Sequence, residues 1–241
     1  MIISLFCFFC NLDYWELLRT IMHRMRLYIL LFLLTSFAIL SLFAQSGVIV
    51  VPDSKGMYES FFALRDSTMR HEIGSFTFTG SLIGLSDKTE IREFEVMSQT
   101  DHSITLFLDD IKVHITAGSF FRTGRHFSYY GPYGYVYKID GRSFWGYDGS
   151  VPERQIYSIE IFYGQDRVQI PFAAYRDIYE PNFCFRYRLI GKVKCHTRAF
   201  LSEDEKRIYV YMLNSRIPSL YEVCWIVTEG SYTGRVVDYA F

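Results

Sequence analysis

The stretch ITLFLDDIKVHI, residues 104–115, decides the fold of this chain. Apolar residues recur at every second position on both sides of Asp109-Asp110, and a period of two is typical of β-strands. Aspartate tolerates the left-handed backbone conformation that a two-residue hairpin turn needs. The stretch therefore predicts a hairpin with one wholly apolar face. The expected cross-strand pairs are Leu108 with Ile111, Leu106 with Val113, Ile104 with Ile115, Phe107 with Lys112, and Thr105 with His114.

Similar alternation, interrupted by turn residues, predicts five more hairpins further along the chain. The first turns at Asp140-Gly141 and would place Tyr137 opposite Phe144 and Val136 opposite Trp145. The second turns near 164–166, where strand 155–163 returns through Val168 and Ile170; the third joins 183–188 to 192–201, and the fourth turns at 202–205 into 207–213. The last turns at Glu229-Gly230 and would place Val227 opposite Tyr232 and Val223 opposite Val236. Consecutive short strands of this kind indicate an all-β protein with antiparallel sheets. We expect a β-sandwich of the jelly-roll type.

One helical pattern precedes the strands, over residues 57–69. Its apolar stripe has spacings of four, three and four residues, which is one face of a helix. The stripe consists of Met57, Phe61, Leu64 and Thr68, with Asp53 or Ser54 as the expected N-cap. We expect one short N-terminal amphipathic helix that packs on the sheets.

Residues 22–46 have the three parts of a secretory signal peptide: a basic start, an apolar run over 27–44 and a small-residue exit at Ala44 to Ser46. We predict that the mature protein is secreted, periplasmic or on the cell surface. The alternative is an uncleaved membrane anchor through 27–44, whose length is at the lower limit for a span. In that case only this segment would contact the membrane.

The signal divides the chain into three predicted parts. Residues 1–21 are interpreted as a wrongly assigned upstream start or a disordered extension, because no basic residue precedes their apolar run. Residues 47–241 form a single β-sandwich domain of about 200 residues, enough for one sizeable core. With 25 basic and 26 acidic residues, the net charge of −1 gives no argument for a nucleic-acid partner.

The hairpin over 183–201 is a candidate anion-binding platform. A three-residue turn at 189–191 would place Phe185 opposite Cys195, with Cys184 on the other face, so the sequence predicts no Cys184–Cys195 disulfide. The same register gathers five basic residues on one face: Arg186, Arg188, Lys192, Lys194 and Arg198. Arg186 would then oppose Lys194, and like charges in that position are unfavourable.

Two interpretations of this basic face remain open. Neighbouring acidic residues could neutralise it, and the candidates are Glu90, Glu93, Glu95, Glu203, Asp204 and Glu205. Alternatively, it binds an anionic ligand such as a sulfated or uronic-acid glycan or an envelope phosphate. The first interpretation is the commoner one, because charged faces are usually only solvated.

The aromatic run at 127–135 is a second candidate site, interpreted as a loop that leads into a strand. Tyr129, Tyr130 and Tyr133 would stack on sugar rings if they are exposed. The structural alternative is that they cover one end of a sheet, since aromatic side chains gain much free energy on burial.

The sequence predicts no cofactor, no metal site and no catalytic residue. It lacks a nucleophile elbow, a phosphate-binding glycine loop and the spacing of zinc ligands. Asp148 with Asp177 or Glu180 is only a weak calcium pattern. We therefore expect a non-catalytic binding or accessory protein for a glycan or envelope component. The alternatives are a polysaccharide-acting enzyme on the same fold and a structural surface protein that binds a protein partner.

Overall fold

The computed structural model divides the chain into two units, Met1–Ile49 and Val50–Phe241. It describes residues 22, 24, 25, 60–85, 89–146, 148–186, 193–214 and 219–240. The predicted signal peptide therefore lies almost entirely outside the described residues. No helix among those residues is long and apolar enough to cross a membrane.

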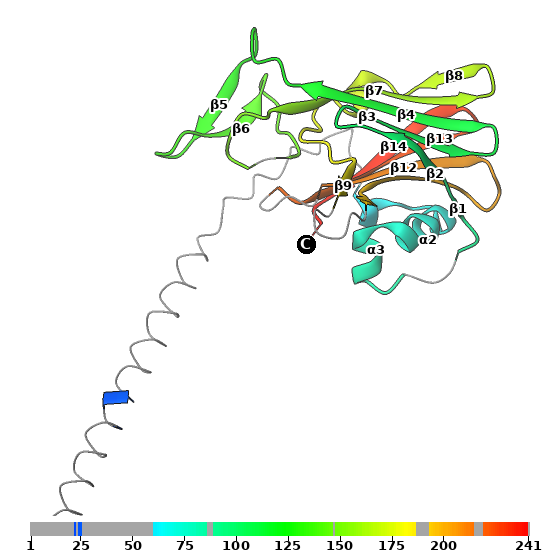
Figure 1. Ribbon diagram of the computed structural model, residues 1–241, viewed down its shortest axis with the longest axis horizontal. Coiled ribbons are helices and arrows are strands. Elements are labelled where there is room, and N and C mark those ends of the chain that lie inside the picture. Colours follow the sequence, from blue (N-terminus) through cyan, green and yellow to red (C-terminus); the bar gives the residue numbers. More distant parts are fainter. Residues whose placement is uncertain are drawn as a thin grey trace, which may run out of the picture. The chain divides into compact units, whose positions relative to one another are not determined.

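The second unit is built mainly from antiparallel strands, which form two five-stranded sheets and two two-stranded ribbons (Figure 1). The first sheet has the order β1-β11-β12-β13-β14. Its strands are β1 (Arg92–Glu93), β11 (Thr197–Leu201), β12 (Arg207–Asn214), β13 (Tyr221–Thr228) and β14 (Ser231–Asp238). The second sheet has the order β2-β3-β4-β7-β8. Its strands are β2 (Glu95–Gln99), β3 (Ser103–Leu108), β4 (Ile111–Ser119), β7 (Arg154–Tyr163) and β8 (Asp166–Gln169).

The ribbons are β5 (Phe127–Tyr130) with β6 (Tyr135–Ile139), and β9 (Cys184–Arg186) with β10 (Val193–Cys195). Short helices complete the described chain: η1 (Phe61–Ala63), α2 (Ser67–Phe76), α3 (Phe78–Leu82) and η2 (Phe172–Ala174).

The two large sheets share one apolar core. Ile115 and Ile159 of the second sheet and Val223 and Trp225 of the first are fully buried in the same cluster. The indole Nε1 of Trp225 donates a hydrogen bond to the carbonyl of Ala174 at 2.8 Å, so its one polar atom is satisfied inside the core. Burial of alternate residues from both sheets explains why the period of two in the sequence is so regular.

The helices cover the other face of the first sheet, where a second apolar cluster forms (Figure 1). Phe76 of α2 stacks on Phe200 of β11 with ring centroids 4.1 Å apart. The start of this layer is tied to the last strand, because the backbone N–H of Phe61 donates to Asp238 at 2.7 Å. Both faces of the first sheet are therefore covered, which accounts for the nearly continuous burial of β12 and β13.

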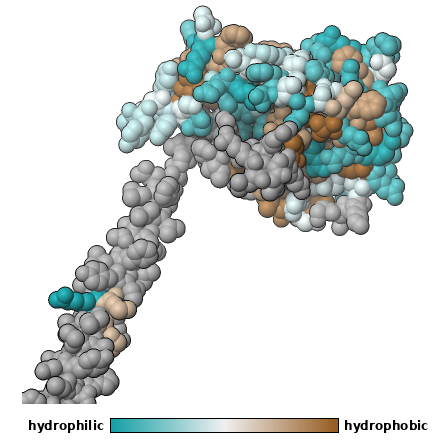
Figure 2. Space-filling view, in the orientation of Figure 1, coloured by the Kyte–Doolittle hydropathy of each residue, from teal (hydrophilic) through white to brown (hydrophobic). Residues whose placement is uncertain are grey.

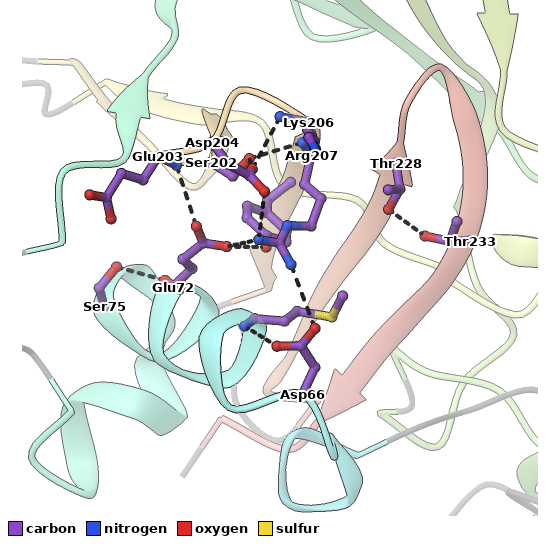
Figure 3. Close-up of polar contacts among 12 residues, drawn as sticks. Asp66, Glu72, Ser75, Ser202, Glu203, Asp204, Lys206, Arg207, Thr228 and Thr233 are labelled. Atoms are coloured by element: carbon purple, nitrogen blue, oxygen red, sulfur yellow. Dashed lines mark hydrogen bonds and ion pairs between the residues drawn. The ribbon is translucent and has the colours of Figure 1, made fainter.

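Polar groups also hold α2 to the sheet (Figure 3). The buried carboxylate of Glu72 accepts hydrogen bonds from the hydroxyl of Tyr209 and the backbone N–H of Glu203. Arg207 lies 3.5 Å from the same carboxylate and 3.7 Å from Asp66. A buried charge is tolerated only when it is paired and hydrogen-bonded, and Glu72 meets both conditions.

The helical prediction over 57–69 is wrong in its bounds. Asp66 accepts a hydrogen bond from the backbone N–H of Met69 at 2.9 Å, so it is the N-cap and the helix begins at Ser67. Leu64 is extended, and Phe61–Ala63 directly before it form the short helix η1. Met57 lies outside the described residues.

Most predicted hairpins are confirmed. The pairs of residues 104–115 match the prediction at every position, with Asp109 at φ 54°. Strands β7 and β8 turn at Gly164-Gln165, β11 and β12 join through 202–206, and Val227 pairs with Tyr232 across Glu229-Gly230. The predicted Val223–Val236 pair is wrong, because a bulge at Ile226/Val227 shifts the register and Val223 pairs with Val237.

Two predicted hairpins are wrong in part. The turn at Asp140-Gly141 exists, with φ values of 51° and 77°, but its strands do not continue to the predicted partners. Strand β6 pairs with β5 instead, and Trp145 makes a parallel bridge to Ile178. The other is the 183–201 hairpin, whose register differs by one residue.

The Cys184–Cys195 prediction is wrong: the two residues face each other and form a disulfide. Six residues lie between the paired Arg186 and Val193, whereas a three-residue turn was expected. Changing the loop from odd to even moves every side chain of one strand to the opposite face. The two cysteines therefore share a face, and Arg186 pairs with Val193 and not with Lys194.

Candidate functional site

The residues predicted as an aromatic loop form a β-hairpin, so the loop interpretation is wrong. Phe127 pairs with Ile139 and Tyr130 with Tyr135 across a turn at 131–134. Gly131 and Gly134 adopt φ values of 71° and 67°, a conformation that side chains rarely allow. We call residues 127–139 the tyrosine hairpin. It projects beyond the two large sheets in Figure 1.

The outer part of the tyrosine hairpin carries exposed rings. Tyr129 is 60% exposed, Tyr130 55%, Tyr133 81% and Tyr135 44%. Tyr133 and Tyr135 contact each other with ring centroids 5.8 Å apart. The projecting hairpin is mostly pale in Figure 2, because tyrosine is intermediate in hydropathy. The predicted residues Tyr129, Tyr130 and Tyr133 thus lie together on one ribbon and open to solvent.

The base of the tyrosine hairpin is held by a small apolar cluster of its own. Val136 and Ile139 of β6 pack with Phe120, Phe144 and Tyr179. Tyr179 meets Phe120 and Phe144 edge to face, with centroids 5.2 and 5.4 Å away. The hairpin is therefore anchored at one end and exposed at the other.

A pocket of about 100 Å³ lies at this base. It is formed by three segments that are distant in sequence: Arg125, residues 139–144 and residues 172–179. Three of its lining residues are arginines, at positions 125, 142 and 176. We call it the arginine pocket. None of these three arginines was expected from the sequence, because no local pattern links position 176 to the Asp140-Gly141 turn.

Two carboxylates also line the arginine pocket, and each has its own arginine. Asp140 accepts from Arg125 at 2.6 Å and from the backbone N–H of His126 at 2.9 Å. The hydrogen bond from His126, followed by that from Arg125, lowers the pKa of Asp140. Asp177 is buried and accepts from Arg235 through both of its oxygens, at 2.9 and 2.8 Å. Asp140 is therefore not placed as a proton donor for acid catalysis, and Asp177 is taken up by its ion pair.

The buried Tyr179 adds a neutral hydroxyl to the wall. Burial is the main cause that raises the pKa of Tyr179 to about 12. Its hydroxyl stays protonated at neutral pH and brings no negative charge into the pocket.

The predicted basic platform over 183–201 does not have the expected register. Strands β10 and β11 are separated at His196 and belong to different sheets. Arg198 of β11 forms a two-point ion pair with Glu93, at 2.6 Å for each bond, and lies over the ring of Phe200. Lys194 is exposed. Arg188 and Lys192 lie outside the described residues.

The described residues contain no group of three or more metal-binding side chains. Asp148, Asp177 and Glu180, the weak calcium pattern, are engaged separately with Ser150, Arg235 and the backbone of Glu153. Cys224 is a free buried thiol, and burial raises its pKa well above the ordinary value. A thiol of this kind is not a nucleophile.

Comparisons with protein-family models, with curated proteins and with solved structures find no match to this chain.

Proposed function

We propose that this protein is a secreted or envelope-exposed, non-catalytic binding module whose ligand is an anionic glycan or a similar envelope component. The observation that carries the proposal is the exposure of Tyr129, Tyr130 and Tyr133 on an anchored, projecting hairpin. Large rings left in solvent gain nothing from the core, whereas they can stack on the apolar face of a sugar.

The location outside the cytoplasm has separate support. The Cys184–Cys195 disulfide is of a type that persists in oxidising compartments. It agrees with export through the basic and apolar signal at 22–46, and we expect that signal to be removed after export. N-terminal sequencing of the exported protein tests this, and a mature chain that still begins at Met1 would contradict it.

We further propose that the two facing sheets form a β-sandwich that holds the binding surface at one end. Residues of both sheets share one core, and the chain passes between the sheets at β1–β2 and again after β8. The jelly-roll form and the role of an N-terminal amphipathic helix stay predictions.

Binding measurements on three variants test the glycan proposal: Tyr129→Ala, Tyr130→Ala and Tyr133→Ala. Each should weaken binding to a retained polysaccharide about fivefold, for roughly 1 kcal/mol of lost stacking. Phe107→Ala is the matched control, because Phe107 is also exposed but lies near the other end of the sheet. Unchanged binding in all three tyrosine variants would overturn the proposal.

A further inference from the structure

The arginine pocket has more positive charge than its acids can balance. Asp140 is paired with Arg125 and Asp177 with Arg235. Within the described part of the chain, Arg142 and Arg176 make no ion pair. Arg142 is exposed and Arg176 half-buried, so the surroundings of the pocket carry an excess of about two positive charges, which would attract an anion.

Arg176 points to the same conclusion through its hydrogen bonding. Its Nε is buried and has no hydrogen-bond partner among the described residues. A buried donor without an acceptor costs free energy, and an unpaired donor in a native fold calls for a bound water or ion. The Arg176 side chain as a whole is only half-buried and lines the pocket, so a bound oxyanion would neutralise its guanidinium through the part that solvent reaches.

The volume of the arginine pocket admits a small anionic group. The pocket measures about 100 Å³, and one water-sized group needs about 10–15 Å³ on the same measure. A carboxylate or a sulfate therefore fits. The rest of a longer ligand would lie outside the pocket.

An apolar ring at the pocket supplies a place for that remainder. Phe172 lines the pocket and is 56% exposed. The tyrosine hairpin begins next to the same pocket, since Asp140 follows directly after Ile139 of β6. Strand β6 has five residues, so the hairpin turn lies about 15 Å away. One short oligosaccharide could contact both places.

We infer that the arginine pocket binds the carboxylate or sulfate group of an acidic glycan through Arg142 and Arg176, while the sugar rings lie on Phe172 and the tyrosine hairpin. The inference rests on the proposed function, since it assigns the anionic part of the same ligand. Guanidinium groups suit this role because they present paired donors to planar or tetrahedral oxyanions.

Polysaccharides that differ only in their anionic groups test the inference. Dextran sulfate is compared with dextran, and polygalacturonate with its methyl ester. Arg142→Gln and Arg176→Gln should each weaken binding of one charged polymer roughly tenfold or more and leave its neutral counterpart unchanged. The charged polymer that responds identifies the group as sulfate or carboxylate. Arg65→Gln is the control for general charge, because Arg65 is exposed and lies before α2.

A second measurement separates failure of the pocket from failure of the proposed function. Titration with inorganic sulfate, followed by the side-chain Nε–H NMR signal of Arg176, needs no glycan. A saturable shift that disappears in Arg142→Gln supports the pocket even if no polysaccharide binds. If no saturable shift is seen, or if Arg65→Gln loses as much charged-polymer binding as the pocket variants, the pocket is not an anion-binding site. The tyrosine variants then decide the proposed function independently.

Discussion

Cys184 and Cys195 occupy directly opposed positions on β9 and β10, and a disulfide joins them. The bond closes an 11-residue separation and fixes the register of a ribbon that has only three residues in each strand. Two-stranded ribbons of this length are marginal without such help. The bond therefore holds together a short ribbon, which is followed two residues later by β11 of the first sheet, beginning at Thr197.

Removal of the disulfide should lower the free energy of unfolding by about 2–3 kcal/mol, because a loop of this size is no longer closed in the unfolded chain. Urea unfolding of Cys184→Ala/Cys195→Ala against the unmodified protein measures the loss. Reducing agent should destabilise the unmodified protein and leave the double variant unchanged, since Cys224 has no disulfide partner. A peptide map without a 184–195 crosslink would contradict the register itself.

Glu222 should be essential for docking of α3. Its carboxylate accepts from the backbone N–H groups of Phe78 and Thr79 at 2.7 and 2.8 Å, and from the hydroxyl of Tyr211 at 2.8 Å. Glu222→Ala leaves these buried donors without an acceptor and should cost about 3 kcal/mol or more.

Tyr211→Phe is the matched control, because it removes one donor and leaves the carboxylate bonded to α3. It should cost about 1–2 kcal/mol in the same unfolding experiment. Burial, followed by the charge of Glu222, raises the pKa of Tyr211, so the hydroxyl remains a donor at neutral pH. A loss for Glu222→Ala no larger than that for Tyr211→Phe would contradict this account.

The buried Asp177–Arg235 pair should show strong coupling. Arg235→Met leaves the carboxylate buried without its cation and should cost about 3–5 kcal/mol. Asp177→Asn/Arg235→Met removes both charges and should recover part of that loss. A double-mutant cycle by chemical denaturation measures the coupling, and additive effects would show that the pair is not energetically linked.

Stability should fall on mild acidification because of His196. Burial and, secondarily, the nearby charge of Lys194 lower its pKa below the ordinary 6.5. In the window below pH 6.5, and above the lowered value, the unfolded chain binds a proton that the folded chain does not, so stability decreases as the pH falls through that window. His196→Gln should flatten this part of the profile in thermal unfolding across pH 5–7.5, whereas His102→Gln, at an exposed position, should not.

The parts of the fold that depend on residues close together in the sequence could be predicted from the sequence. Residues 104–115 fold with the expected pairs because a two-residue turn and a period of two leave only one register that buries the apolar face. The hairpin at 183–201 has no comparable turn signal, and a single-residue error in register there put Cys184 opposite the wrong residue, so its disulfide with Cys195 was not predicted. The bulge at Ile226/Val227 likewise has no mark in the sequence.

The candidate site depended on contacts that no local pattern records. Tyr133 is exposed because the hairpin projects from the sheets. The same alternation of aromatic residues in the sequence is also expected of a buried hairpin, so the sequence alone does not predict this exposure. The arginine pocket requires Arg125 and Arg176 to meet, which the anchoring of β6 against Tyr179 brings about. The tyrosines that the sequence singled out lie in the exposed hairpin, whereas its basic candidates at 183–201 are not the arginines that line the pocket.

The hydrogen bond from Phe61 to Asp238 joins positions 177 residues apart in the chain. The first and last described elements of the domain therefore meet, and a linker of a few residues would connect residue 60 to residue 240. A circularly permuted protein that is joined there and opened between Asp109 and Asp110, both of which are exposed, keeps every strand pair. The sheets could thus form with the strands in a different order along the chain. The new N- and C-termini would lie far from the tyrosine hairpin and would not disturb it.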